Sequence, residues 1–234
     1  GCGGRVVDGA AYDGRPAAFY GVVGLEAIWR EAVCRAKREV GRYYYLDNAY
    51  FDATRGKHFR VGVNALQATG CERPDWQRFS RITLGIQPWR RDGRHVVVVE
   101  QSEHFMAVVA GWPAPAWREH VVQTLRQHTD RLIVVRHWQR DKAERVRTLR
   151  EDLKDAWAVV THTSAAANEA LVAGIPVFVT GPSAAAVMGS SDLTAIEKPR
   201  RPDGRYDWAA ALAGRQWTVE ELRDGTAWKA LNEA

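Results

Sequence analysis

The second half of the chain alternates short apolar runs with amphipathic stretches. Apolar runs without polar alternation are typical of strands buried on both faces of a sheet. They predict strands at Val96–Glu100, Arg131–Arg136, Ala156–Thr161 and Ile175–Val179. Apolar residues at helical spacing predict the intervening helices, at Ala116–His128, Lys142–Leu153 and Ser164–Ala173. This βαβαβαβ order indicates an α/β protein with a doubly wound parallel sheet.

The first half is less regular, and the tail departs from both patterns. Aromatic and apolar residues predict N-terminal strands at Arg5–Val7, Phe19–Val23, Tyr43–Leu46 and Phe59–Val63, with a helix at Leu25–Val40. Residues 67–94 lack periodicity, so we expect an irregular segment with at most short helices. The tail is expected to form helices at Trp208–Ala213 and Val219–Arg223, the second opened by a capping box of Thr218 and Glu221.

These patterns divide the chain at two boundaries. We expect an N-terminal domain over residues 1–94, shorter than a full Rossmann domain, and a C-terminal domain over 95–205. The helices of residues 206–234 are expected to pack back on the N-terminal domain.

The charge is unevenly distributed. The 234 residues carry a net charge of +5, and residues 1–115 hold 16 Lys and Arg against 12 Asp and Glu, which is +4 of that excess. A polyanion would therefore bind the N-terminal half. The alternative is a coding bias, because Arg outnumbers Lys 27 to 6.

Composition also bears on location. No apolar run approaches the roughly 18–20 residues of a membrane span, and no secretory signal is visible. The three cysteines are widely spaced and without a CxxC pair, so we expect them to be reduced. The protein is expected to be cytoplasmic, in the host cell if a phage encodes it, with no membrane contact and no protein partner evident.

The sharpest chemical signal follows the predicted strand Ala156–Thr161. Thr163 and Ser164 stand where a helix begins, and helix starts hold phosphate because their N–H groups are unpaired. Glu169, further along that helix, is placed to accept hydrogen bonds from ribose hydroxyls. The alternative is structural, since Ser and Thr are ordinary N-cap residues.

The spacing Ser164-x4-Glu169-Ala170-Leu171-x2-Gly174-x-Pro176 resembles the nucleotide-sugar signature of GT-B glycosyltransferases. Related spacing occurs in UDP-sugar 2-epimerases and capsule-type sugar transferases. The resemblance implies a GT-B-like fold of two Rossmann-like halves and a nucleotide-sugar donor, a UDP-sugar first of all. It assigns Thr163 and Ser164 to the diphosphate and Glu169 to the ribose.

Other segments are similar to uncharacterised phage-encoded proteins of this glycosyltransferase kind. They are Phe19-Tyr20-Gly21, Tyr44 to Phe51, Gly181 to Ala185 and Gln216-Trp217-Thr218. This similarity covers nearly the whole chain and implies a glycosyltransferase without defining its substrates.

Two further strand ends are expected at the same crevice, because ligands bind at the carboxyl ends of strands in open α/β sheets. Arg136, Arg140 and Lys142 are candidates for neutralising a diphosphate leaving group, and Ser102 and His104 for contacting donor phosphate or acceptor. The alternative is that these basic residues and His104 are solvated surface.

An inverting transferase needs a base beside the acceptor hydroxyl. Asp47, at the end of an aromatic strand, is our candidate and Asp8 the second choice, although Asp47-Asn48 also suits a turn. No Asp pair forms a DxD motif, and no grouping has zinc-site spacing, so metal-independent transfer is expected.

The sequence therefore predicts a metal-independent glycosyltransferase, with 5-hydroxymethylpyrimidine in phage DNA as the acceptor. A base flipped from the duplex would be replaced by side chains of the 67–94 segment, where Trp76, Trp89, Arg90 and Arg91 are candidates. The alternatives are a sugar-nucleotide epimerase, a polysaccharide glycosyltransferase, or a non-catalytic protein that binds nucleotide or DNA.

Overall fold

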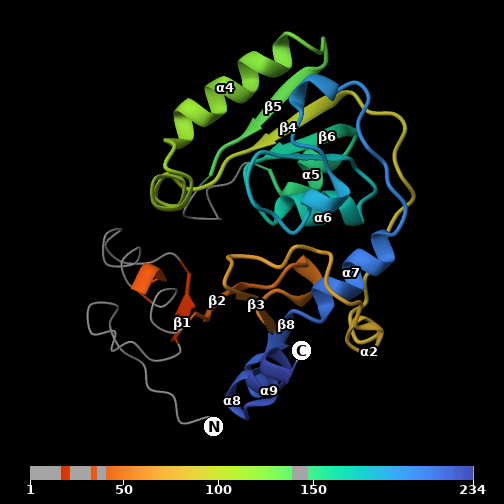
Figure 1. Cartoon of the computed structure of the whole chain (residues 1–234). Coiled ribbons are helices and arrows are strands. Elements are labelled where there is room, and N and C mark those ends of the chain that lie inside the picture. The colour runs from red at the N-terminus through yellow and green to blue at the C-terminus, as the bar shows by residue number, and fades with distance from the viewer. Residues whose placement is uncertain (1–16, 22–32, 36–40, 139–146, 234) are drawn as a thin grey trace.

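The computed structural model describes residues 17–21, 33–35, 41–138 and 147–233, which form two sheets (Figure 1). The elements before the second sheet are β1 (Ala17–Tyr20), β2 (Tyr43–Asn48), η2 (Asp52–Thr54), β3 (His58–Val63) and α2 (Trp76–Phe79). The second sheet and its helices comprise β4 (His95–Val99), α3 (Glu103–Phe105), η3 (Met106–Ala110), α4 (Ala114–Arg126), β5 (Leu132–Arg136), α5 (Leu149–Leu153), β6 (Ala156–Thr161), α6 (Ala166–Val172) and β7 (Val177–Val179). The remaining elements are η4 (Ala186–Met188), η5 (Leu193–Ala195), α7 (Arg205–Ala213), β8 (Gln216–Thr218), α8 (Val219–Arg223) and α9 (Thr226–Glu233).

The C-terminal sheet, which we call sheet B, has the strand order β5-β4-β6-β7, and all its neighbouring strands are parallel. Val96 and Val98 of β4 pack in one core with α4, whereas Val97 and Val99 pack in the core that contains α6. Helices therefore cover both faces of the sheet. This confirms the parallel α/β arrangement, which arises because continuous apolar strands must be covered on both sides.

The N-terminal sheet, sheet A, has the order β1-β2-β3-β8 and is mixed. Strands β1 and β2 are parallel, but β3 runs antiparallel to both β2 and β8. The expected second Rossmann-like half is therefore not what the described strands form. The edge strand β8 comes from the C-terminal tail, so the chain returns from sheet B to complete sheet A before α8 and α9.

A shared core joins the two sheets. Tyr50 and Phe51, which follow β2, pack in the same buried cluster as the alanines of α6 and Trp208 of α7. The Trp208 indole N–H donates to the Ala184 carbonyl at 2.8 Å, and its ring meets Phe51 edge to face. This packing fixes the two sheets relative to one another (Figure 1).

Several predicted bounds are corrected by local hydrogen bonding. Within the described part of the helix expected at Lys142–Leu153, α5 begins at Leu149, because Thr148 and Glu151 form a capping box there; residues 142–146 lie outside the described residues. Strand β2 continues through Asn48, so Asp47 lies in a strand rather than a turn. The helix expected at Ser164–Ala173 begins at Ala166. Strand β8 and helix α9 were not predicted.

Other expectations are confirmed. Strand β6 has the predicted bounds, β3 begins one residue early, and α8 begins with the expected capping box. The strand expected at Arg5–Val7 and most of the helix expected at Leu25–Val40 lie outside the described residues. No helix within the described ranges has both the length and the apolar character that crossing a membrane requires.

Candidate active site

A cleft of about 1390 Å³ lies between the two sheets and is lined by residues of both. Its sheet B wall includes the ends of β4 and β6, and the chain passes from β4 to β5 on one side and returns to β6 on the other. This is the topological switch point of the parallel sheet, where open α/β sheets bind ligands. The volume exceeds the ~300–1,000 Å³ typical of a pocket for one small ligand.

Gln101 and Thr163 join the two strand ends at the base of the cleft. The Thr163 N–H donates to Oε1 of Gln101 at 2.8 Å, and Nε2 of Gln101 donates to the Thr163 hydroxyl at 2.9 Å. Gln67, from the sheet A side, donates to the Thr163 carbonyl at 2.8 Å. Thr163, predicted to bind diphosphate, is only 3% exposed and bonded to Gln101. Thr163 also lines the cleft, and its contact with diphosphate stays a prediction; Gln101 was missed because its partner lies 62 residues away.

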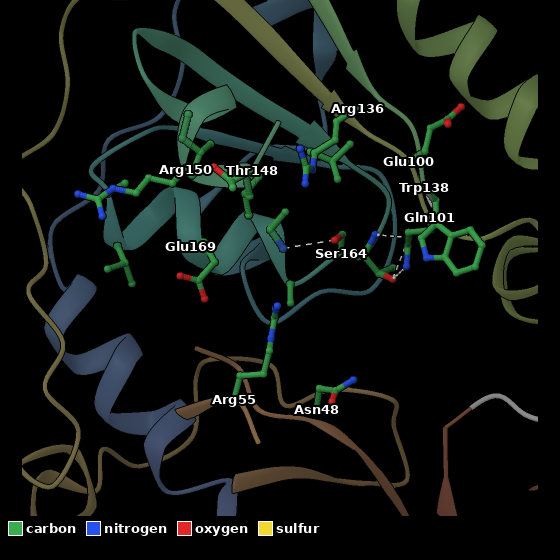
Figure 2. Close-up of a pocket in the computed structure, with 18 of the residues that line it drawn as sticks. Asn48, Arg55, Glu100, Gln101, Arg136, Trp138, Thr148, Arg150, Ser164 and Glu169 are labelled. Carbon is green, nitrogen blue, oxygen red and sulfur yellow. Dashed lines mark hydrogen bonds between the residues drawn. The ribbon is translucent and has the colours of Figure 1, made fainter. Parts of the chain in front are cut away.

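Ser164 and Glu169, the other residues of the predicted motif, both line the cleft. The Ser164 hydroxyl accepts from the Ala166 N–H at 3.3 Å, so it stands beside the first turn of α6. Figure 2 shows the Glu169 carboxylate directed from α6 into the same space. The motif therefore brings a hydroxyl and a carboxylate together on the sheet B wall.

Arg136 also lines the cleft, but its charge is compensated. Its guanidinium is ion-paired with Asp152 and donates to the Arg147 carbonyl at 2.9 Å. Asp152 also pairs with the Arg147 side chain at 3.3 Å, so the three groups carry a net charge of +1. Sequence spacing gave no signal for this pairing, which depends on where α5 begins. Lys142 and Arg140 lie outside the described residues.

A histidine–carboxylate pair stands at the end of β4 and was not predicted. Glu100 is buried and binds Arg118 at 2.6 Å through Oε1 and Nδ1 of His137 at 2.8 Å through Oε2. The His137 side chain is 61% exposed and lines the cleft beside Trp138. Glu100 and Arg118 thus fix the orientation of an imidazole that solvent and ligands can reach. The position of Glu100 directly after an apolar strand was the available signal.

Asp47, the predicted base, lies on the sheet A wall. Its carboxylate accepts from Arg60 at 2.7 Å, from the Asn48 N–H at 2.7 Å and from the Tyr45 hydroxyl at 3.4 Å. Burial first, and then the Asp47 charge, raise the pKa of Tyr45, so that hydroxyl stays protonated and donates. These contacts engage both oxygens of the Asp47 carboxylate, and its catalytic role stays a prediction. Asp8 lies outside the described residues.

The remaining candidates lie in two places. Ser102 lines the cleft and caps α3, accepting from the Phe105 N–H at 3.1 Å. His104 is exposed on α3 and does not line the cleft. Among the described residues, no group of three or more His, Cys, Asp or Glu side chains is placed to hold a metal ion.

Two of the four side chains suggested for holding a flipped-out base are committed to internal contacts. Arg90 donates to the carbonyls of Leu153 and Ala156 at 2.8 and 3.0 Å. The Trp89 indole donates to a backbone carbonyl at 3.0 Å, and Arg205 stacks over its ring. These contacts give Trp89 and Arg90 structural roles without DNA, whereas Trp76 is half exposed and Arg91 is exposed.

Comparison with known proteins identifies the kind of fold that this chain has. No protein-family model matches the sequence, and no curated protein matches it significantly. Among solved structures, the chain is similar to the KpsC β-Kdo 2,7 transferase of Thermosulfurimonas dismutans, with a TM-score of 0.52 and 14% identity over 93% of this chain and 99% of that one. The KpsC β-Kdo 2,4 transferase of the same organism is also similar, with a TM-score of 0.49 and 16% identity over 90% of this chain and 86% of that one. The first likeness shows that this chain has a glycosyltransferase-like fold.

Proposed function

We propose that this protein is a glycosyltransferase that binds a nucleotide-sugar donor in the cleft and moves the sugar to an acceptor hydroxyl. The observation that carries the proposal is the cleft at the switch point of sheet B, with hydroxyl, carboxylate and guanidinium groups on its walls. The fold shared with a Kdo transferase supports it, although one fold hosts many functions.

We propose that the donor binds against the polar groups of the sheet B wall. We assign its phosphates to the Ser164 hydroxyl, to Arg136 of β5 and to Arg150 of α5. We assign its ribose to Glu169. Arg150 and Lys154 line this wall and are exposed, so they can accommodate a dianion without losing an internal ion pair. Such cations stabilise the charge that develops on the leaving phosphate, so the proposed transfer requires no metal. UDP is our first choice of nucleotide.

Two residues are candidates for the base that takes the proton from the acceptor hydroxyl, Asp47 and His137. A histidine oriented by a carboxylate suits proton transfer. Asp47 already accepts hydrogen bonds from Arg60, Asn48 and the Tyr45 hydroxyl. The kcat/KM values of His137→Gln and Asp47→Asn separate them, since only loss of the base removes most of the rate.

For the acceptor we keep 5-hydroxymethylpyrimidine in DNA as the proposal. Its support is the basic excess of residues 1–115 and the presence of Arg55 on the sheet A wall. The second candidate is a sugar hydroxyl of a polysaccharide, which the structural similarity to a Kdo transferase favours.

One assay tests these proposals together. Nucleotide sugars are incubated with the protein and either hydroxymethylated DNA, unmodified DNA or an oligosaccharide, and the products are weighed by mass spectrometry. A gain of one sugar mass on hydroxymethylated DNA alone supports the first acceptor, and a gain on the oligosaccharide supports the second. Nucleotide release without an acceptor indicates an epimerase or hydrolase, and binding without turnover indicates a non-catalytic protein.

A further inference from the structure

Arg55 rises from the sheet A side of the cleft toward the opposite wall. Figure 2 shows its guanidinium directed at the part of sheet B that carries Ser164 and Glu169, whereas Arg136 points into the same space from above. All four residues line the cleft. A group bound between them would therefore meet a hydroxyl and a carboxylate on one wall and a guanidinium on the other.

Near Ser164 and Glu169, the sheet B wall has less uncompensated positive charge than its number of arginines indicates. Arg136 is paired with Asp152, whose side chain is only 5% exposed, and Arg147 shares the same carboxylate. Arg90 is held by two backbone carbonyls. Arg150 and Lys154 are exposed cations of this wall, and Arg55 adds a guanidinium from the opposite wall.

The turn that carries Arg55 is firmly built. The Thr54 side chain, 3% exposed, donates to the Phe51 carbonyl at 2.8 Å and exchanges hydrogen bonds with buried Gln216 of β8. The Lys57 N–H donates to the Thr54 carbonyl at 3.1 Å, and Gly56 turns the chain with φ of 76°. The backbone of Arg55 is thus fixed before any ligand binds, which reduces the entropy lost on binding.

We propose that Arg55 binds a phosphate of the donor from the sheet A wall, so that the bound nucleotide bridges the two sheets. The proposal rests on the proposed function, because it assumes a nucleotide in the cleft. It assigns to the N-terminal half a direct part in donor binding, in addition to holding the acceptor.

The test is calorimetric titration with UDP and CMP, with uridine and cytidine as phosphate-free probes. The variants are Arg55→Ala, Arg55→Lys and, as a matched control, Arg73→Ala, which removes an exposed arginine that does not line the cleft. We expect the Kd for the nucleotide to rise about tenfold or more in Arg55→Ala, as charge-assisted contacts to phosphate predict. Arg55→Lys should recover part of that loss, and binding of the nucleoside should not change.

The outcomes distinguish a failure of the Arg55 assignment from a failure of the proposed function. Equal nucleotide affinity in Arg55→Ala and Arg73→Ala would overturn the assignment of Arg55 while leaving the proposed function intact. An equal loss for nucleotide and nucleoside would also overturn it, because the effect would then not involve phosphate. A wild-type protein that binds none of these probes nor any nucleotide sugar would contradict the proposed function itself.

Discussion

Replacing Asp152 by Asn tests how the cations of the sheet B wall are held. The Asp152 side chain is 5% exposed and pairs with Arg136, which is 13% exposed, and with Arg147, which is 54% exposed. Removing one partner of a buried ion pair costs about 3–5 kcal/mol, because the other charge stays buried without compensation. Water solvates Arg147, so Arg136 carries most of the penalty. We expect the free energy of unfolding to fall by about 3 kcal/mol.

Urea and thermal unfolding of Asp152→Asn, wild type and Asp92→Asn measure this difference. Asp92 is exposed, so its variant removes the same charge without breaking a buried pair and should change stability by less than about 0.5 kcal/mol. For a chain of this size, 3 kcal/mol corresponds to a Tm lower by about 6–12 °C. UDP should bind more tightly to Asp152→Asn, because Arg136 is then no longer neutralised. Equal stability of the two Asn variants would refute this reasoning.

Three further predictions concern the frame of the cleft. Gly174→Ala should lower the unfolding free energy by at least about 2 kcal/mol in urea, because φ is 76° and a Cβ would lie 2.0 Å from the Pro88 carbonyl oxygen; an unchanged midpoint would contradict this. Thr163→Val should cost about 1 kcal/mol by leaving the Gln101 amide without its acceptor, whereas Thr163→Ser, which keeps the hydroxyl, should cost less. Burial lowers the pKa of His162, so stability should fall as pH drops below the unfolded value of about 6.5; a His162→Gln profile as steep as wild type would show that other groups are responsible.

Local sequence signals were enough to predict the strands of sheet B. Strand β6 is a continuous apolar run whose ends follow from the residues themselves, and Thr218 with Glu221 marks the start of α8. The same capping signal, Thr148-x-x-Glu151, marks the start of α5 at Leu149. Caps therefore locate helix starts that periodicity alone leaves undefined.

Long-range contacts account for what was missed. Strand β8 has three residues, and its strand conformation depends on pairing with β3, more than 150 residues earlier. The motif placed Ser164 and Glu169 correctly on the cleft, but the engagement of Thr163 by Gln101 and of Arg136 by Asp152 depends on tertiary packing. A sequence pattern shows which groups reach a site and not which of them are already bonded there.

The most direct test of the central claim is a crystal structure of the protein soaked with UDP. Our account predicts electron density in the cleft between the sheets, with the phosphates between Ser164 and Arg55 and the ribose at Glu169. Density for the nucleotide at any other surface, or an empty cleft at a UDP concentration shown by calorimetry to saturate the protein, would contradict it.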